Sequence, residues 1–406
     1  GAEEVAFDAA AHLTAVVGDR RARVEDGIRW SRMAQIHLSR LTDVAGLRRA
    51  DLSSQLGNLH HRRGDYASAR RLHEQALEVV RRSLGPDHPS VAVILNNLGN
   101  VYFREGDYDA ARRLHERALG IKEASLGPDH PSVAMSLNNL GLVLERQGDY
   151  ASARRVHERA LAIREASLGS DHPDVASSLN NLANAYLLLG DNDRALRLYE
   201  RVVEIKVRSL GREHPSVART VTNVATVHYQ RGAYDEAIRW YRRALETQER
   251  ALGPNHPSVA VTLNNLAEVY LTLGDLASAR RLFRRALAIW EASLGPDHPN
   301  VAYAVSGLAK IALAQRRPAE AVAHAERALA LREGDKALPE QIADTRFLLA
   351  RALWAAGRDR ARALELARKA RDGFRDTGKA AEASLAEVEA WLAERDHGRK
   401  RSPTKR

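Results

Sequence analysis

The sequence predicts an all-α protein, built as a right-handed superhelical solenoid of antiparallel helix pairs. The first observation is a segment of the form Ser-Leu-Gly-Pro-Asp-His-Pro, which returns every 42 residues without insertion or deletion. The second is composition, because hydrophobic residues make up 44% of the chain and aromatic residues only 5%. A chain rich in Ala, Leu and Val suits closely packed helices. The leucines that mark the period are Leu84, Leu126, Leu168, Leu210, Leu252 and Leu294.

Each unit contains two amphipathic segments. Apolar residues recur within residues 90–105 at i, i+4, i+7 and i+11, which is one stripe of helical period. They are Val91, Leu95, Leu98 and Tyr102. We call this predicted segment helix A. Gly106 breaks it, and a second amphipathic segment, helix B, continues to about Leu126.

The residues between helix B and the next helix A are typical of helix ends. Gly127 is expected in the left-handed conformation just after helix B. Asp129 is expected to cap the next helix, and Pro131 fits its first turn. Each unit therefore predicts a tight link to the unit that follows.

Small residues at fixed points predict close approach of the helices. Gly99, Ala111 and Ala118 recur one period later as Gly141, Ala153 and Ala160, and larger side chains there would push the helices apart. A helix-B position that changes from His to Tyr and Phe in register indicates a packing role. Its members are His73, His115, His157, Tyr199, Tyr241 and Phe283.

The chain divides into four predicted parts. Residues 1–47 supply N-terminal capping helices, and residues 48–333 form seven helix pairs with the 42-residue period. Residues 334–396 form a divergent repeat and a C-terminal capping helix, because the period decays there. Residues 397–406 form a basic, disordered tail. Because the chain begins with Gly rather than Met, we expect it to be a piece of a longer protein.

Composition also excludes several kinds of chemistry. The absence of cysteine excludes disulfides, thiolate zinc sites and cysteine nucleophiles, and it fits a reducing cytoplasm. No apolar run approaches the length of about 18 residues that a membrane span needs. The net charge is +10, but much of that excess lies in the last ten residues. We expect a soluble, cytoplasmic chain without a cofactor.

The order Leu95-x-x-Leu98-Gly99-x-x-Tyr102 followed by Ala111 resembles the tetratricopeptide repeat, whose usual period is about 34 residues. The segments His172-Pro-Asp-Val-Ala and Leu179-Asn-Asn-Leu-Ala are similar to the longer repeat of kinesin light chains and their bacterial relatives. The array also resembles the region that follows the kinase domain of some bacterial, notably myxobacterial, serine/threonine kinases, or a nucleotide-binding regulatory domain. No kinase motif occurs in this chain.

One helix-A position carries asparagine in five consecutive repeats, although Asn is a poor residue inside a helix. The resemblance implies that this position faces a concave groove, where an amide can pair with a peptide backbone. Alternatively, one Asn of each adjacent pair bridges neighbouring repeats. The ladder consists of Asn97, Asn139, Asn181, Asn223 and Asn265, and four of these follow Asn96, Asn138, Asn180 and Asn264.

Further positions expected on the same groove vary between repeats, as a ligand-selecting surface would. They are Asn100, Arg104, Arg146, Asn184, Arg219, Tyr229, Glu268 and Lys310. Their basic bias favours a peptide with acidic groups or a free carboxylate. The alternative is an ordinary solvated surface.

Six histidines at constant spacing suggest metal binding, but side chains one repeat apart are too distant to share an ion. We therefore expect them to cap and pack the loops. They are His88, His130, His172, His214, His256 and His298. No motif of a catalytic site stands out. Arginine pairs on helix B, such as Arg70-Arg71, could form a basic stripe, which the glutamates that follow partly neutralise.

The sequence thus predicts a non-catalytic scaffold that binds a protein or peptide through the groove, as part of a bacterial signalling protein. Two alternatives stay open. The array could serve as a spacer or self-association module, or as a basic solenoid that binds nucleic acid. The chain lacks the interleaved aromatic residues that binding to a single strand would lead us to expect. The oligomeric state and the identity of the partner remain undetermined by the residues.

Overall fold

The computed structural model describes residues 1–20, 23–42, 46–333, 339–377 and 381–400, and every regular element in these ranges is helical. The predicted all-α architecture of consecutive helix pairs is confirmed. The chain divides into two compact units, Gly1–Leu182 and Ala183–Arg406, each described here by itself. Within the described ranges, no helix is long and apolar enough to cross a membrane.

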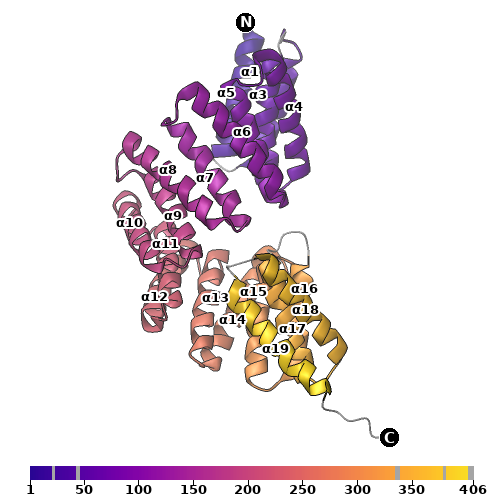
Figure 1. Ribbon diagram of the computed structural model, residues 1–406. Helices are drawn as coiled ribbons and strands as arrows, with labels where there is room; N and C mark the ends of the chain where they lie inside the picture. The colour runs from indigo at the N-terminus through magenta and orange to yellow at the C-terminus, as the bar shows by residue number, and fades with distance from the viewer. Residues whose placement is uncertain (21–22, 43–45, 334–338, 378–380, 401–406) are drawn as a thin grey trace. The chain divides into compact units, whose positions relative to one another are not determined.

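The first unit begins with a helix, a π-helical segment and a second helix, and then continues as helix pairs (Figure 1). Helix α9 (Pro173–Leu188) contains the boundary between the units. The other elements of the first unit are α1 (Ala2–Leu13), η1 (Thr14–Arg20), α2 (Val24–Leu38), α3 (Leu47–Arg63), α4 (Tyr66–Leu84), α5 (Pro89–Glu105), α6 (Tyr108–Leu126), α7 (Pro131–Arg146) and α8 (Tyr150–Leu168).

The second unit continues the same alternation of helix A and helix B and ends on a single helix. Its elements are α10 (Asn192–Leu210), α11 (Pro215–Gln230), α12 (Tyr234–Leu252), α13 (Pro257–Thr272), α14 (Leu276–Leu294), α15 (Val301–Ala314), α16 (Pro318–Arg332), α17 (Pro339–Ala355), α18 (Arg360–Thr377) and α19 (Glu382–Lys400). Four residues of the predicted disordered tail, 397–400, therefore continue helix α19, and the remaining six lie outside the described residues.

Each repeat buries its apolar stripe against the next repeat. One core cluster joins Ala76 and Val80 of α4 to Val91 and Leu95 of α5 and Ala118 of α6, all of them at most 7% exposed. Burying a Val or Leu side chain contributes about 1.5–3 kcal/mol. Since these contacts join consecutive helices, the stacking of neighbours provides the core that a single pair lacks.

The helix ends differ from the prediction in two details, the N-cap of α7 and the conformation of Gly127. The N-cap of α7 is His130 and not Asp129, because His130 Nδ1 accepts a hydrogen bond from the backbone N–H of Ser132 at 3.1 Å. Pro131 begins the helix as expected. The loop histidines of the other repeats accept the equivalent bond, so their predicted capping role is confirmed. These bonds involve His88, His172, His214, His256 and His298.

Gly127 also departs from the expected geometry. Its φ is +89°, which favours glycine, but its ψ of 154° is extended and not left-handed helical. The extended ψ turns the chain away from the axis of α6 and starts the short link that ends at His130. The same link recurs at the end of α8, where Gly169 has φ 83° and ψ 158°.

The helix-B series predicted to pack is buried in every member. His115 is 1% exposed, and its Nδ1 lies 3.2 Å from Asn96 Oδ1. The far edge of the imidazole lies against Gly99 of α5, where an added Cβ would be 2.8 Å from Cε1 and Nε2. Gly99 is therefore required by the close approach of the ring rather than by backbone conformation.

We expect Gly99→Ala to lower the free energy of unfolding by about 1–3 kcal/mol, because the buried ring has no room to retreat. This loss opposes the advantage of about 1 kcal/mol that Ala has over Gly inside a helix. Urea denaturation, monitored by circular dichroism, measures the net change in the free energy of unfolding. Gly120→Ala is the matched control, since nothing lies within 4 Å of a Cβ there. Equal effects of the two changes would contradict the explanation.

Candidate functional site

The first asparagine of the adjacent pairs joins neighbouring repeats in the first unit. Asn96 is 5% exposed, and its Oδ1 accepts a hydrogen bond from Asn139 Nδ2 at 3.0 Å. Asn138 is 6% exposed, and its Nδ2 donates to Ser178 Oγ at 3.0 Å. Its Oδ1 lies 3.0 Å from His157 Nδ1. The alternative expected from the sequence, a bridge between repeats, is confirmed for these two residues.

The ladder of second asparagines is half-buried at all five positions, Asn97, Asn139, Asn181, Asn223 and Asn265. Its members differ in their contacts. Asn139 bonds to Asn96, and Asn265 is hydrogen-bonded to the hydroxyl of Tyr241. The side-chain amides of Asn97 and Asn181 form no hydrogen bond with the part of the chain that the structure describes.

The other residues expected on the groove fall into two groups. The arginines Arg104, Arg146 and Arg219 are exposed, and the Arg146 guanidinium lies over the Phe103 ring at 5.8 Å. Asn100 and Asn184 are half-buried. Because Asn184 Oδ1 accepts the hydroxyl of Tyr199, it packs helix A of its repeat against helix B.

The arginines of helix B are partly neutralised, by a glutamate of the same helix, as their spacing indicated, or by one of the following helix A. Arg70 Nη1 lies 3.0 Å from Glu105 Oε2, and Arg112 Nε lies 2.8 Å from Glu116 Oε1. Ion pairs on an exposed surface contribute little to stability, but they reduce the positive potential that a nucleic acid would require.

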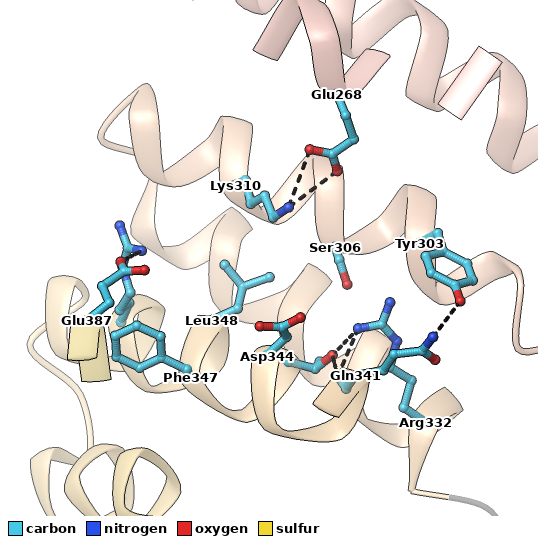
Figure 2. A pocket seen from close by; sticks show the side chains of 12 residues that line it. Glu268, Tyr303, Ser306, Lys310, Arg332, Gln341, Asp344, Phe347, Leu348 and Glu387 are labelled. Carbon is cyan, nitrogen blue, oxygen red and sulfur yellow. Dashed lines mark hydrogen bonds and ion pairs between the residues drawn. The ribbon is translucent and has the colours of Figure 1, made fainter. Parts of the chain in front are cut away.

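The largest difference from the sequence prediction is a pocket in the second unit, which composition and motifs did not indicate. It has a volume of about 380 Å³ and lies between α13, α15, α17 and α19 (Figure 2). Its walls combine charged, polar and aromatic side chains. They are Glu268, Tyr303, Ser306, Lys310, Arg332, Gln341, Asp344, Thr345, Phe347, Leu348, Arg351 and Glu387.

The three cations of the pocket are all engaged by the chain itself. Lys310 Nζ lies 3.3 Å from Glu268 Oε1 and 3.4 Å from Oε2. Arg351 Nη1 lies 3.0 Å from Glu387 Oε1.

The third cation, Arg332, is 6% exposed. Its Nη1 donates to the carbonyl oxygen of Gln341 at 3.0 Å and also to Thr345 Oγ1. Arg332 thereby holds the end of α16 against the first turns of α17, so its guanidinium is part of the pocket wall.

Two polar groups of the pocket are not engaged. Asp344 is exposed to the open space of the pocket and forms no ion pair with the described residues. Burial by the surrounding walls raises the pKa of its carboxyl above the ordinary value, although Lys310 and Arg332 oppose that shift. Ser306 is 7% exposed, and its Oγ has no hydrogen-bond partner among the described residues. Buried polar atoms without a partner are rare.

A second cavity of about 480 Å³ adjoins the pocket and shares Lys310, Leu348, Arg351 and Glu387 with it. Aromatic residues of α17 and α19 line its other side. The Trp354 and Trp391 rings lie 5.6 Å apart, and the Arg395 guanidinium lies 4.0 Å from the centre of the Trp391 ring. This cluster packs α19 against α17.

Metal binding has no structural counterpart in the described ranges, because no three His, Asp or Glu side chains lie together there as ligands would. Comparison with known proteins identifies the family of the chain. The tetratricopeptide repeat model matches residues 48–124, 90–166, 132–208, 216–292 and 260–334. The chain belongs to the tetratricopeptide repeat family. Proteins of this family generally act as scaffolds for protein–protein interaction.

Solved structures are similar over much of the chain. A putative kinesin light chain repeat protein from Podosopora anserina is 29% identical, covers 51% of this chain and 98% of its own, and has a TM-score of 0.45. The apo form of RapI is 16% identical over 71% of this chain and 97% of its own, with a TM-score of 0.56.

A tetratricopeptide repeat protein from Parabacteroides merdae is 19% identical over 75% of this chain and 98% of its own, with a TM-score of 0.52. At this level of identity, RapI and the Parabacteroides protein support the fold alone. No curated protein matches the chain.

Sequence reasoning missed the pocket because the period slips by one residue before α17. Lys122 Nζ bonds to Ser136 Oγ, 14 residues further on, whereas Arg332 bonds to Thr345, 13 residues further on. When the slip is taken into account, Asp344 aligns with Tyr303 of the preceding repeat. Of the residues that line the pocket, only Glu268 and Lys310 had been expected on the groove.

Proposed function

We propose that the chain is a non-catalytic scaffold that binds a protein or peptide partner along the exposed faces of its A helices. The observation that carries the proposal is the ladder of half-buried amides, of which Asn97 and Asn181 have no partner within the described residues. An amide both donates and accepts, so it can pair with the backbone of an extended segment. Membership of the tetratricopeptide repeat family supports the same function.

We further propose that the parts of the partner that contact Arg104 and Arg146 of the first unit, or Arg219 of the second, carry acidic groups or a free carboxylate. These guanidinium groups are exposed, and Arg pairs with carboxylates in a bidentate geometry. A cytoplasmic, bacterial signalling protein is the context that we propose for this scaffold, on the resemblance of its repeats to arrays that follow kinase or nucleotide-binding domains.

The structural alternative, a spacer or self-association module, is favoured by the amides of Asn96 and Asn138, which join repeats. The two functions predict different effects of substitution. Removal of an amide that has no internal partner affects only the binding of a ligand. Removal of a bridging amide leaves buried polar groups unpaired and lowers the free energy of unfolding by about 1–3 kcal/mol.

We expect the double variant Asn97→Ala, Asn181→Ala to retain the denaturation midpoint of the wild type and to lose partner proteins captured from a bacterial lysate. Quantitative mass spectrometry of the pull-downs measures this loss. Nuclease treatment beforehand removes proteins that are bridged to the chain by nucleic acid. Asn96→Ala is the matched control, since it should lower stability and retain capture. Identical capture by the double variant and the wild type would reject the amide ladder as a binding surface.

A further inference from the structure

We propose that the pocket between α13, α15, α17 and α19 binds the side chain of a lysine or arginine in an extended segment of the partner. The inference rests on the proposed scaffold function and assigns the chemistry of one contact. It also differs from the acidic preference proposed for the exposed arginines, which lie outside this pocket.

The contacts that remain available in the pocket favour a cation. Lys310 and Arg351 are each matched by a glutamate, and Arg332 by a carbonyl and a hydroxyl. Asp344 forms no ion pair with the described residues, although the charges of Lys310 and Arg332 favour its ionised form and those of Glu387 and Glu268 oppose it. The lining carries three cations and three carboxylates, so the preference comes from direct contacts. The Asp344 carboxylate can accept a hydrogen bond from a bound cation, whereas each of the three cations already has a partner in the chain.

The second observation is the unpaired hydroxyl of Ser306. Figure 2 shows this side chain directed into the space that Lys310, Asp344 and Arg332 surround. The hydroxyl is more than nine-tenths buried and has no partner in the described chain. A bound ammonium or guanidinium group could donate one hydrogen bond to this oxygen and another to Asp344.

Size and lining also suit one long side chain. A volume of about 380 Å³ lies near the lower end of ligand pockets, which begin at roughly 300 Å³. Phe347 and Leu348 offer apolar surface to the aliphatic part of a lysine or arginine. The aromatic faces are not free for stacking, since Arg332 lies over Tyr303 at 5.0 Å and Arg351 over Phe347 at 5.6 Å.

The test uses the full chain and three pools of fluorescein-labelled nonapeptides. Each pool is randomised except at the central residue, which is Lys or Arg in the first pool, Glu in the second and Leu in the third. Fluorescence anisotropy gives the dissociation constants. We expect the basic pool to bind about ten-fold more tightly than the other two, as one charge-assisted hydrogen bond implies.

Asp344→Asn should remove this preference, and Ser306→Ala should weaken it without affecting the other pools. Asp297→Asn is the matched control, because it removes one negative charge from a loop where Asn255 occupies the equivalent position in the preceding repeat. This control should bind all pools like the wild type. It therefore separates the pocket from the effect of net charge.

Two results would overturn the inference while leaving the scaffold function intact. One is equal binding of all three pools, and the other is tighter binding of the Glu pool. An unchanged preference in Asp344→Asn would likewise place the basic side chain elsewhere. If no pool binds, the peptide-binding function fails at this face together with the inference.

Discussion

Acidification from pH 7 to pH 5 is expected to destabilise the first unit by about 2 kcal/mol for each of two histidines, His73 and His115. Burial lowers the pKa of each imidazole from 6.5 to about 4. Between these values the unfolded chain binds protons that the folded chain cannot, so stability is complete above pH 6.5 and falls as the pH approaches 4. Urea denaturation at several pH values measures this loss.

The control for the acid prediction uses chemistry already present in the chain. Tyr241 occupies the helix-B position of His115 in a later repeat, and Ala225 occupies the position of Gly99. The double variant Gly99→Ala, His115→Tyr should fold and should lose about half of the extra destabilisation at pH 5. If its pH dependence matches that of the wild type, other titrating groups cause the acid lability.

Trp290→Ala is expected to lower the free energy of unfolding of the second unit by about 3–5 kcal/mol. Trp290 in α14 is 2% exposed and packs in one cluster with Val301, Val305 and Leu308 of α15. Its loss opens a cavity between two consecutive repeats. Urea denaturation followed by far-UV circular dichroism measures the change, and Trp30→Ala, at a position 38% exposed, should cost much less.

A compensating variant tests the origin of the Trp290 effect. In most other repeats the same helix-B position holds a polar residue that bonds to the next helix A, as Lys122 Nζ does to Ser136 Oγ at 2.8 Å. After Trp290, Ala304 stands in the position of Ser136, and Trp290 Nε1 has no hydrogen-bond partner among the described residues. Trp290→Lys combined with Ala304→Ser should be more stable than Trp290→Ala, and equal stability would show that only the lost volume matters.

The sequence was sufficient for features that repeat. Because one unit contains its own helix-breaking glycine and its apolar stripes, the alternation of helices A and B follows from local chemistry. The cap of helix B was not predicted: Asp107 Oδ1 accepts a hydrogen bond from the backbone N–H of Ala110 at 2.9 Å at the start of α6. The burial of His115 and Tyr199 was also predictable, since they exchange with each other in register.

The tertiary structure alone decided which polar groups are engaged. Asn96 and Asn97 are adjacent and chemically identical, yet the rotation of about 100° per helical residue turns Asn96 toward His115 and Asn139 and leaves Asn97 unbonded within the described chain. The pocket likewise joins Ser306 and Asp344 to Glu387 from helices that have no common sequence signal. The repeat determined the fold, because its interactions are between neighbours in sequence. The candidate site depends on non-local packing, to which a one-residue slip of the period before α17 contributes.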